Sequence, residues 1–240
     1  MRNRFWVGGL RPAGLVAGLC LALLAQLSLA PQAMAGNPGP LDSLNEAQSA
    51  DVALRQNHAA LTHDPADQLI GAPKGDVTIV EFFDYACPFC KAAEPALETL
   101  LQRDRGVKLV VKELPILSPQ SMVASKVALA GAKQGKYAAF HQALLLHKGP
   151  LNEAAIYGVA RDVGLDPARL RADINAPDID RQIAGNLALA RAVHVSGTPT
   201  FIVDDHFLTQ PSGQIDFAAV VAAARKDRAR PGLGGRSEGE

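Results

Sequence analysis

The sequence predicts an α/β fold in which a β-α-β unit and a β-β-α unit flank an all-helical insertion, with a further helix near the N-terminus. Residues 77–83 give the strongest strand pattern, because they are apolar on both faces like a central parallel strand. Residues 118–193 are helical in pattern throughout, and two short strands and a last helix follow. With 48% apolar residues in 240, the chain is able to form a sizeable core, and wholesale disorder is excluded.

The charge and the cysteine content of the chain exclude some classes of protein function. The chain carries 24 basic and 24 acidic residues and no basic stripe interleaved with aromatic residues, so nucleic-acid binding is not supported. Three cysteines are too few for a disulfide scaffold. Two of them, Cys87 and Cys90, lie three residues apart, and a bridge between them would close too small a loop to stabilise the chain much. We therefore expect the pair to serve chemistry rather than structure.

The first 35 residues predict a secretory signal peptide. Arg2, Arg4 and Arg11 precede an uncharged apolar stretch at residues 15–29. Ala33-Met34-Ala35 follows as a small-x-small cleavage site, so cleavage is expected after Ala35. A membrane anchor is the alternative, but an apolar run of about 15 residues is shorter than the roughly 20 that span a bilayer. The sequence therefore predicts an exported protein.

A helix is predicted at residues 41–61, before the main domain. Its apolar stripe is narrow and consists of Leu44, Ala47, Leu54 and Leu61. A helix of about 20 residues is marginal in water by itself, so the stripe needs a partner. Either it packs on the core of its own chain, or it pairs between protomers and makes a homo-oligomer. Residues 62–76 carry two prolines and two glycines and are expected to form a loop.

The main domain is placed at residues 70–228. A helix from Cys87 to about Arg103 joins the strand at 77–83 to a second strand at 107–114, which makes a right-handed βαβ unit. Helices are then expected at about 120–133, 137–147, 152–164, from Asp166-Pro167 onward, and at 178–193. Strands at 200–203 and 206–209, a helix at 217–225 and a disordered tail at 229–240 complete the prediction.

The motif Cys87-Pro88-Phe89-Cys90 follows a buried strand and opens a helix. A thiolate at a helix N-terminus meets unpaired backbone N–H groups and the positive end of the helix dipole, which lowers its pKa. Cys87 is therefore the expected attacking thiol, and Cys90, one turn inside, the resolving thiol of a redox-active disulfide. The alternatives are an inert bridge and a zinc site, although structural zinc normally takes four protein ligands.

With these residues in view, the sequence resembles the thioredoxin superfamily, through Phe-Phe-Asp-Tyr-Ala-Cys-Pro-Phe-Cys at 82–90 and Gly-Thr-Pro-Thr at 197–200. The helical insertion makes it similar to the DsbA-like thiol–disulfide oxidoreductases of the bacterial periplasm. Residues 113–121, 134–137 and 164–166 resemble a subgroup that contains the suppressor-of-copper-sensitivity protein C and Com1-like proteins.

The resemblance implies a thioredoxin fold and a periplasmic enzyme that forms, isomerises or reduces disulfides in cysteine-containing exported proteins. It implies a membrane redox partner that resets the cysteines, and no metal or organic cofactor. It also implies that Thr198-Pro199 is a cis bond beside the cysteines, with Pro199 in the catalytic machinery. Thr198, Pro88 and Phe89 are then expected to contact the substrate. Phe89 stands where the most oxidising members carry histidine, so a less oxidising pair is expected.

Glu81 is a further catalytic candidate. By strand alternation it shares a face with Ile79 and Phe83 and is expected to be buried. Family members often carry a buried carboxylate here, which implies proton transfer to or from Cys90 through water. Lys112 in the neighbouring strand is the expected ion-pair partner, and a purely structural pair is the alternative.

We expect the remaining polar residues near the motif, and the histidines, to have structural roles. Asp84 and Tyr85 are expected to shape the loop before Cys87, and the six histidines share no metal-binding spacing. The competing function is a binding module, either a chaperone-like thioredoxin fold or a copper-binding one, because two exposed thiols are able to bind Cu(I).

Overall fold

The computed structural model describes residues 40–208 and 215–230, with side chains from residue 48 onward. The predicted signal peptide at 1–35 lies outside the described residues, as does the predicted tail from residue 231. Within the described ranges, no helix is long and apolar enough to cross a membrane.

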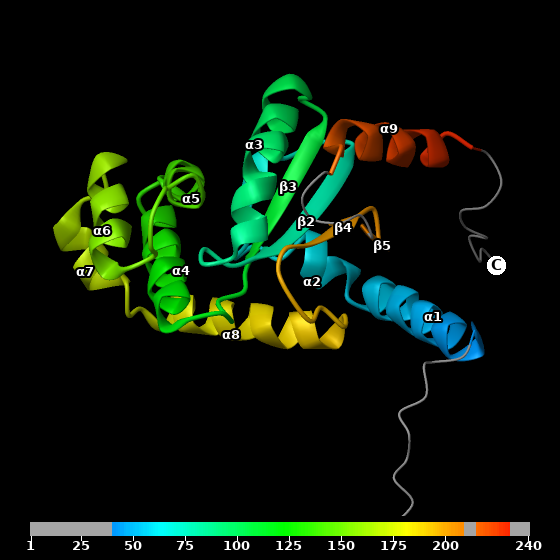
Figure 1. Ribbon diagram of the computed structural model, residues 1–240, viewed down its shortest axis with the longest axis horizontal. Coiled ribbons are helices and arrows are strands. Elements are labelled where there is room, and N and C mark those ends of the chain that lie inside the picture. Colours follow the sequence, from blue (N-terminus) through cyan, green and yellow to red (C-terminus); the bar gives the residue numbers. More distant parts are fainter. Residues whose placement is uncertain (1–39, 209–214, 231–240) are drawn as a thin grey trace, which may run out of the picture. The chain divides into compact units, whose positions relative to one another are not determined.

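A five-stranded sheet of order β1-β3-β2-β4-β5 forms the centre of the domain (Figure 1). Its strands are β1 (Gln68–Gly71), β2 (Val77–Phe83), β3 (Val107–Glu113), β4 (Thr200–Val203) and β5 (His206–Phe207). β2 and β3 are parallel, as the predicted βαβ unit requires, and the other pairs are antiparallel. Because β4 pairs directly with β2, the chain after the insertion returns beside the strand that leads to Cys87.

Strand β1 was not predicted, because residues 62–76 were expected to form a loop. It has four residues and pairs with β3 at the edge of the sheet, with Gln68 opposite Val111. So short a segment, ended by Gly71 and followed by Pro73, carries too little alternation to indicate a strand from sequence alone.

Helices cover both faces of the sheet. Residues Val77, Ile79 and Phe83 point to the face that packs against α3 (Pro88–Arg103) and α9 (Phe217–Arg228). Val80 and Phe82 point to the opposite face, where α1 (Pro40–Gln56), α2 (His58–Thr62) and the end of α8 (Pro177–Ala192) supply the apolar partners. This alternation places Glu81 on the side of α3, the helix that carries Cys90.

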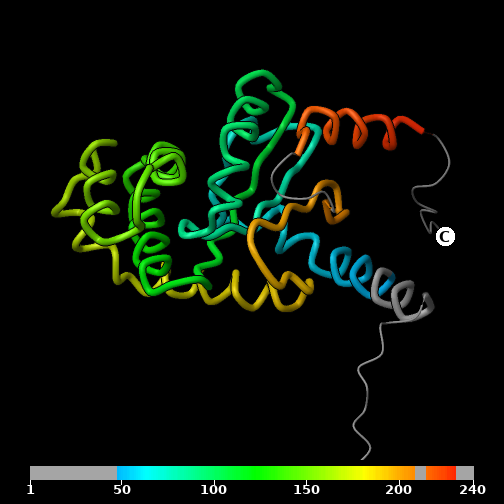
Figure 2. The backbone as a smooth tube through the Cα atoms, viewed as in Figure 1, coloured from blue at the N-terminus to red at the C-terminus, as the bar shows by residue number. Residues whose placement is uncertain are grey.

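The predicted insertion is helical and lies between β3 and β4. Figure 2 follows the backbone from β3 through these helices and back into the sheet. They are α4 (Pro119–Ala132), α5 (Tyr137–Leu145), α6 (Glu153–Asp162), α7 (Pro167–Asp173) and α8. Their starts agree with the sequence signals, because the side chains of Ser118, Asn152 and Asp166 each cap a helix N-terminus.

The N-terminal segment forms two helices rather than the single predicted one, with Asn57 between α1 and α2. Leu54 and Leu61 are fully buried against the sheet face that carries Val80 and Phe82. At least this part of the predicted stripe therefore packs on the core of its own chain, whereas Leu44 and Ala47 lie outside the described side chains.

Candidate active site

The two thiols stand where strand β2 passes into helix α3. Cys87 is the N-cap of α3, and Pro88 occupies the first turn, where its missing N–H costs no hydrogen bond. The backbone N–H of Cys90 donates to Cys87 Sγ at 3.4 Å. Both cysteines are free thiols and almost fully buried, whereas Pro88 and Phe89 between them are exposed.

The environment separates the two thiols in acidity. Hydrogen bonding lowers the pKa of Cys87 to about 6, first through the Cys90 side chain, next through Thr198, and then through the backbone N–H groups of Cys90 and Phe89, against the opposing effect of burial. Burial raises the pKa of Cys90 far above its ordinary value. At pH 7 Cys87 is mostly thiolate and Cys90 a thiol, which is the division of roles that disulfide exchange needs.

A distant loop closes one side of the thiol pair. The Thr198-Pro199 bond is cis, in agreement with what the resemblance implied. The Cys87 thiol donates a hydrogen bond to the carbonyl oxygen of Thr198 at 3.1 Å. The loop is held because Thr200 enters β4 opposite Phe82, and its hydroxyl donates to the carbonyl of Gly197 at 2.8 Å.

Glu81 is buried on the α3 side of the sheet, as its strand position predicts. Burial, followed by the nearby carboxylate of Glu94 and the Cys87 sulfur, raises its pKa well above the ordinary range. One of its carboxyl oxygens, Oε2, is buried without a hydrogen-bond partner among the described residues. The carboxyl group therefore lies near the redox pair in surroundings that disfavour its charged form.

The predicted ion pair between Glu81 and Lys112 is wrong. In the parallel register Glu81 lies opposite Val111, and Lys112 lies opposite Phe82, so the two charged side chains point to opposite faces of the sheet. The Lys112 ammonium instead donates to the Asp67 carboxylate and, at 2.7 Å, to the carbonyl of Ala60. These contacts attach α2 and the residue before β1 to β3, on the face of the sheet opposite Glu81.

A buried polar cluster behind the active-site loop was missed by the sequence analysis. The Glu113 carboxylate accepts hydrogen bonds from the hydroxyls of Ser125 (2.6 Å), Tyr137 (2.7 Å) and Tyr85 (3.3 Å). The Tyr85 hydroxyl also lies 3.3 Å from Nδ1 of His141. Burial raises the pKa of Glu113 to about 8. The register places Glu113 opposite Phe83, on the same face of the sheet as Glu81. Its partners come from α4, from α5 and from the loop before Cys87, and no spacing in the sequence reveals them.

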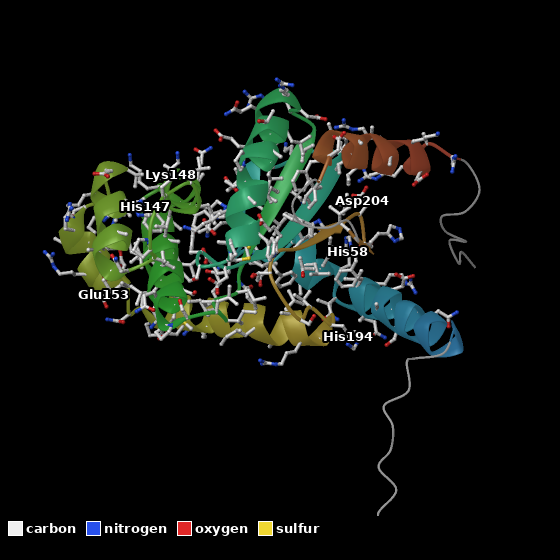
Figure 3. All side chains as sticks on the ribbon, viewed as in Figure 1. His58, His147, Lys148, Glu153, His194 and Asp204 are labelled. Atoms are coloured by element: carbon white, nitrogen blue, oxygen red, sulfur yellow. The ribbon has the colours of Figure 1, made fainter. Side chains whose placement is uncertain are left out.

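Asp84 and Tyr85 shape the loop before Cys87, as expected. The carboxylate of Asp84 is buried and accepts hydrogen bonds from four groups, while Tyr85 fixes the loop to the Glu113 cluster. The histidines are scattered. Figure 3 shows His58, His147 and His194 on separate parts of the domain. Within the residues that the structure describes, no three His, Cys, Asp or Glu side chains are arranged to hold a metal ion.

Comparison with known proteins adds a family to this geometry. The model of the DsbA-like thioredoxin domain matches residues 78–223. A solved thioredoxin-like oxidoreductase from Silicibacter pomeroyi DSS-3 is 41% identical, with a TM-score of 0.67 over 72% of this chain and 99% of that chain. The catalytic domain of Proteus mirabilis ScsC is 28% identical, with a TM-score of 0.65 over 75% of this chain and 99% of that chain.

The chain also matches part of a much larger protein. The Na(+)/H(+) antiporter NhaA 3 of Salinispora tropica is 36% identical over 177 residues, which are 71% of this chain and 26% of the antiporter. The chain thus spans about a quarter of the length of that curated relative. The family match covers the redox pair, the helical insertion and the cis-proline loop together. The chain belongs to the DsbA-like thioredoxin domain family.

Proposed function

We propose that this protein is an exported thiol–disulfide oxidoreductase that exchanges disulfides with cysteine-containing proteins through Cys87 and Cys90. The observation that carries the proposal is the position of Cys87 Sγ at the mouth of α3, 3.4 Å from the backbone nitrogen of Cys90 and 3.1 Å from the carbonyl oxygen of Thr198. A thiolate there is stabilised by the N–H groups of the first turn of α3, while the Thr198 carbonyl accepts a hydrogen bond from the protonated thiol. The partner thiol is within one helical turn.

The reaction is written in the oxidising direction as two exchanges. A client thiolate attacks Cys87 in the Cys87–Cys90 disulfide, which forms a mixed disulfide and releases Cys90 as a thiolate that takes up a proton. A second client thiolate attacks the client sulfur of the mixed disulfide and releases Cys87. The client loses two electrons and two protons. The protein gains both electrons, Cys90 takes one proton, and the other goes to solvent while Cys87 remains a thiolate. Reduction begins from the Cys87 thiolate and uses the same steps in reverse. Isomerisation begins with the same attack, after which a different client thiolate displaces Cys87, so that no electrons are transferred overall.

Other residues are assigned supporting roles. Glu81, buried beside the pair, donates a proton to Cys90 when it leaves and takes one when it attacks, through water. Thr198 presents its backbone to an extended client segment, and Pro199 in the same loop adds no competing N–H. Pro88 and Phe89, exposed beside Cys87, contact the client. The chemistry needs no metal or organic cofactor.

We also propose the periplasm as the location, because the first 35 residues have the pattern of a cleaved signal peptide. A membrane redox partner would return the cysteines to their working state after each cycle. A homo-oligomer formed through the N-terminal helix would surround a client with more than one active site, which favours isomerisation of wrongly paired disulfides.

The test compares the mature protein with its Cys87→Ser and Cys90→Ser variants in insulin reduction and in oxidation of a dithiol peptide. Turnover should vanish in both variants, and Cys90→Ser should accumulate mixed disulfides because no resolving thiol remains. A Cys87→Ser protein that keeps full activity would reject the enzyme. It would favour the alternative, a chaperone-like or copper-binding module whose thiols do no catalysis.

A further inference from the structure

Two buried lysines of β3 point to the face of the sheet that α2 covers. Lys108 and Lys112 are four residues apart on one strand, so their side chains leave the same face. The Lys112 ammonium pairs with the carboxylate of Asp67 and also donates to the carbonyl of Ala60 in α2. Lys112 thus shows how a lysine is accommodated on this face, with one carbonyl from α2 and one carboxylate.

Lys108 has the first kind of partner and lacks the second. Its ammonium donates to the carbonyl of Thr62, also in α2, at 3.3 Å, and the residue is only 9% exposed. Within residues 40–208 and 215–230, no Asp or Glu side chain forms an ion pair with Lys108. A buried ammonium is stable where acceptors or a counter-ion replace its water, and one long hydrogen bond to a carbonyl replaces little of it. The surroundings of Lys108 therefore favour a further anionic group.

A cavity of about 490 Å³ adjoins Lys108. Leu61, Val80 and Ile202, which belong to the apolar cluster between α2 and the sheet, form one part of its wall. Thr78 also lines it and lies directly opposite Lys108 in the parallel pair of β2 and β3. A volume of this size accommodates a small organic molecule rather than a single ion. The cavity therefore offers an ammonium and an apolar wall to one ligand.

The other charges at the cavity restrict the charge of that ligand. Asp204 pairs with Arg228, and Oδ1 of Asp205 lies 2.6 Å from Nδ1 of His58. Figure 3 shows His58 and Asp204 at the same end of the sheet. The two carboxylates repel a dianion such as phosphate, whereas one carboxylate is neutralised by the Lys108 ammonium alone. A monoanion with an apolar body therefore suits this cavity better than an inorganic dianion.

We propose that this cavity is a second ligand site, which binds a small organic carboxylate. The carboxylate pairs with the Lys108 ammonium, and the apolar body of the ligand packs on Leu61, Val80 and Ile202. A short-chain acid and the C-terminal carboxylate of a peptide both have this chemistry. The site lies at the amino ends of β2 and β3, about 20 Å along β2 from the end that leads to Cys87. It is therefore separate from the thiols and does not depend on the proposed disulfide exchange.

The experiment titrates the ¹⁵N-labelled mature protein with butyrate and follows the amide signals by NMR. The signals of Thr78, Lys108 and Ile202 should shift along one saturable curve. Butyramide has the same size without the charge and should bind at least about tenfold more weakly, because it lacks the charge-assisted hydrogen bond. Phosphate should give no saturable shift at these residues. Equal binding of butyrate and butyramide would overturn the proposal without any variant, as would the absence of saturable binding by every carboxylate tested.

Two tripeptides Gly-Ala-Leu, one with a free and one with an amidated C-terminus, tell the two sources of the carboxylate apart. Binding of the free form alone would assign the site to peptide C-termini as well as small acids. Binding of butyrate and of neither peptide would restrict the site to small acids.

Lysine variants test the assigned ammonium. Lys108→Met keeps an unbranched side chain and removes the charge, so the dissociation constant for butyrate should rise at least about tenfold. Lys148→Met is the matched control, because Lys148 is an exposed lysine of the helical insertion, far from Asp204 in Figure 3. Its dissociation constant should equal that of the wild type. A Lys108→Met protein with unchanged affinity, or a Lys148→Met protein with the same loss, would overturn the site.

Discussion

At the scale of single residues, the two thiols differ because one caps a helix and the other lies inside it. The N–H groups of the first turn of α3 point at Cys87 Sγ, and the same turn buries Cys90 away from water. A small difference of position along one helical turn therefore separates the acidities of the two sulfurs. It does so without a charged side chain at position 89, which is Phe89.

Alkylation of the reduced protein tests this difference. Iodoacetamide should modify Cys87 with a half-maximal rate near pH 6, because its pKa is lowered to about 6 by hydrogen bonding. Cys90 should stay unmodified over the same range, because burial raises its pKa. Mass spectrometry of peptides from samples quenched at each pH measures both rates. Equal rates at the two sulfurs would contradict the assignment.

Glu113 gives the stability of the protein a dependence on pH. Burial raises its pKa to about 8 in the folded state, from an ordinary value of 4.5. A carboxyl group with a raised folded pKa contributes stability that is fully present below pH 4.5 and is lost as the pH rises through about 8. Glu113→Gln should therefore lose less stability than the wild type between pH 5 and pH 8.

Urea unfolding of both proteins at several pH values measures this effect. The difference between their free energies of unfolding should change by up to about 1.4 kcal/mol per pH unit inside that window. Glu81 and Glu94 also have raised pKa values and contribute to the pH dependence of both proteins. The difference in free energy of unfolding between wild type and Glu113→Gln therefore isolates Glu113 better than the pH dependence of either protein alone. A difference that is constant with pH would show that Glu113 is charged in the folded protein.

At the scale of elements, the N-terminal helices cover a sheet face that would otherwise be open to water. Leu54 of α1 and Leu61 of α2 are fully buried there with Val80, Phe82 and Ile202. A protein shortened to begin near Asp67 would lose this cover and the carbonyl of Ala60 that holds Lys112. Such a truncation therefore reports on stability as well as on assembly.

Leu61→Ala should lower the free energy of unfolding by about 2–5 kcal/mol, because it leaves a cavity under a fully buried side chain. Val52→Ala is the matched control, since Val52 is exposed on the preceding helix and should change stability by less than about 0.5 kcal/mol. Urea denaturation followed by circular dichroism gives both values. Equal, small effects would mean that α2 does not pack on the sheet in solution.

Elements with strong local signals could be predicted, and those that depend on pairing could not. Four of the five insertion helices, α4, α6, α7 and α8, begin at a capping side chain, at a proline or at both, so their starts are predictable within a few residues. Strand β1 exists because β3 offers it an edge, and Lys112 faces away from Glu81 because of the register with β2. The local pattern of residues predicts neither the free edge of β3 nor the register between β2 and β3.

At the scale of the whole molecule, the proximity of Cys87 and Thr198 is predicted only by the resemblance to a family. The two residues are 111 positions apart, and no periodicity connects them. The hydrogen-bonded groups around Asp84 and Glu113 could not be predicted for the same reason. Each carboxyl group accepts hydrogen bonds from segments that come together only in the folded protein. A site assembled across a long insertion is therefore predictable in its reactive motif and not in its surroundings.

Assembly is the prediction at this scale. The mature protein beginning at residue 36 should be oligomeric by light scattering, and a protein beginning at Ser49 should be a monomer. The shorter protein keeps Leu54 and Leu61 on the sheet, so its fold should be intact. It should retain thiol oxidation and lose isomerase activity on a scrambled substrate, since only one active site then faces each client. A mature protein that scatters as a monomer would remove the basis for this prediction.

The separation of 111 residues between Cys87 and Thr198 also sets an order of events during biosynthesis. A chain that is made from its N-terminus contains the thiol pair long before β4, the strand that must pair with β2 and bring Thr198 to the sulfur. Until that strand is made, the sheet is incomplete and Cys87 lacks the Thr198 carbonyl as its hydrogen-bond acceptor. The protein therefore passes through a stage of synthesis in which its two thiols are present and the loop that later covers them is absent.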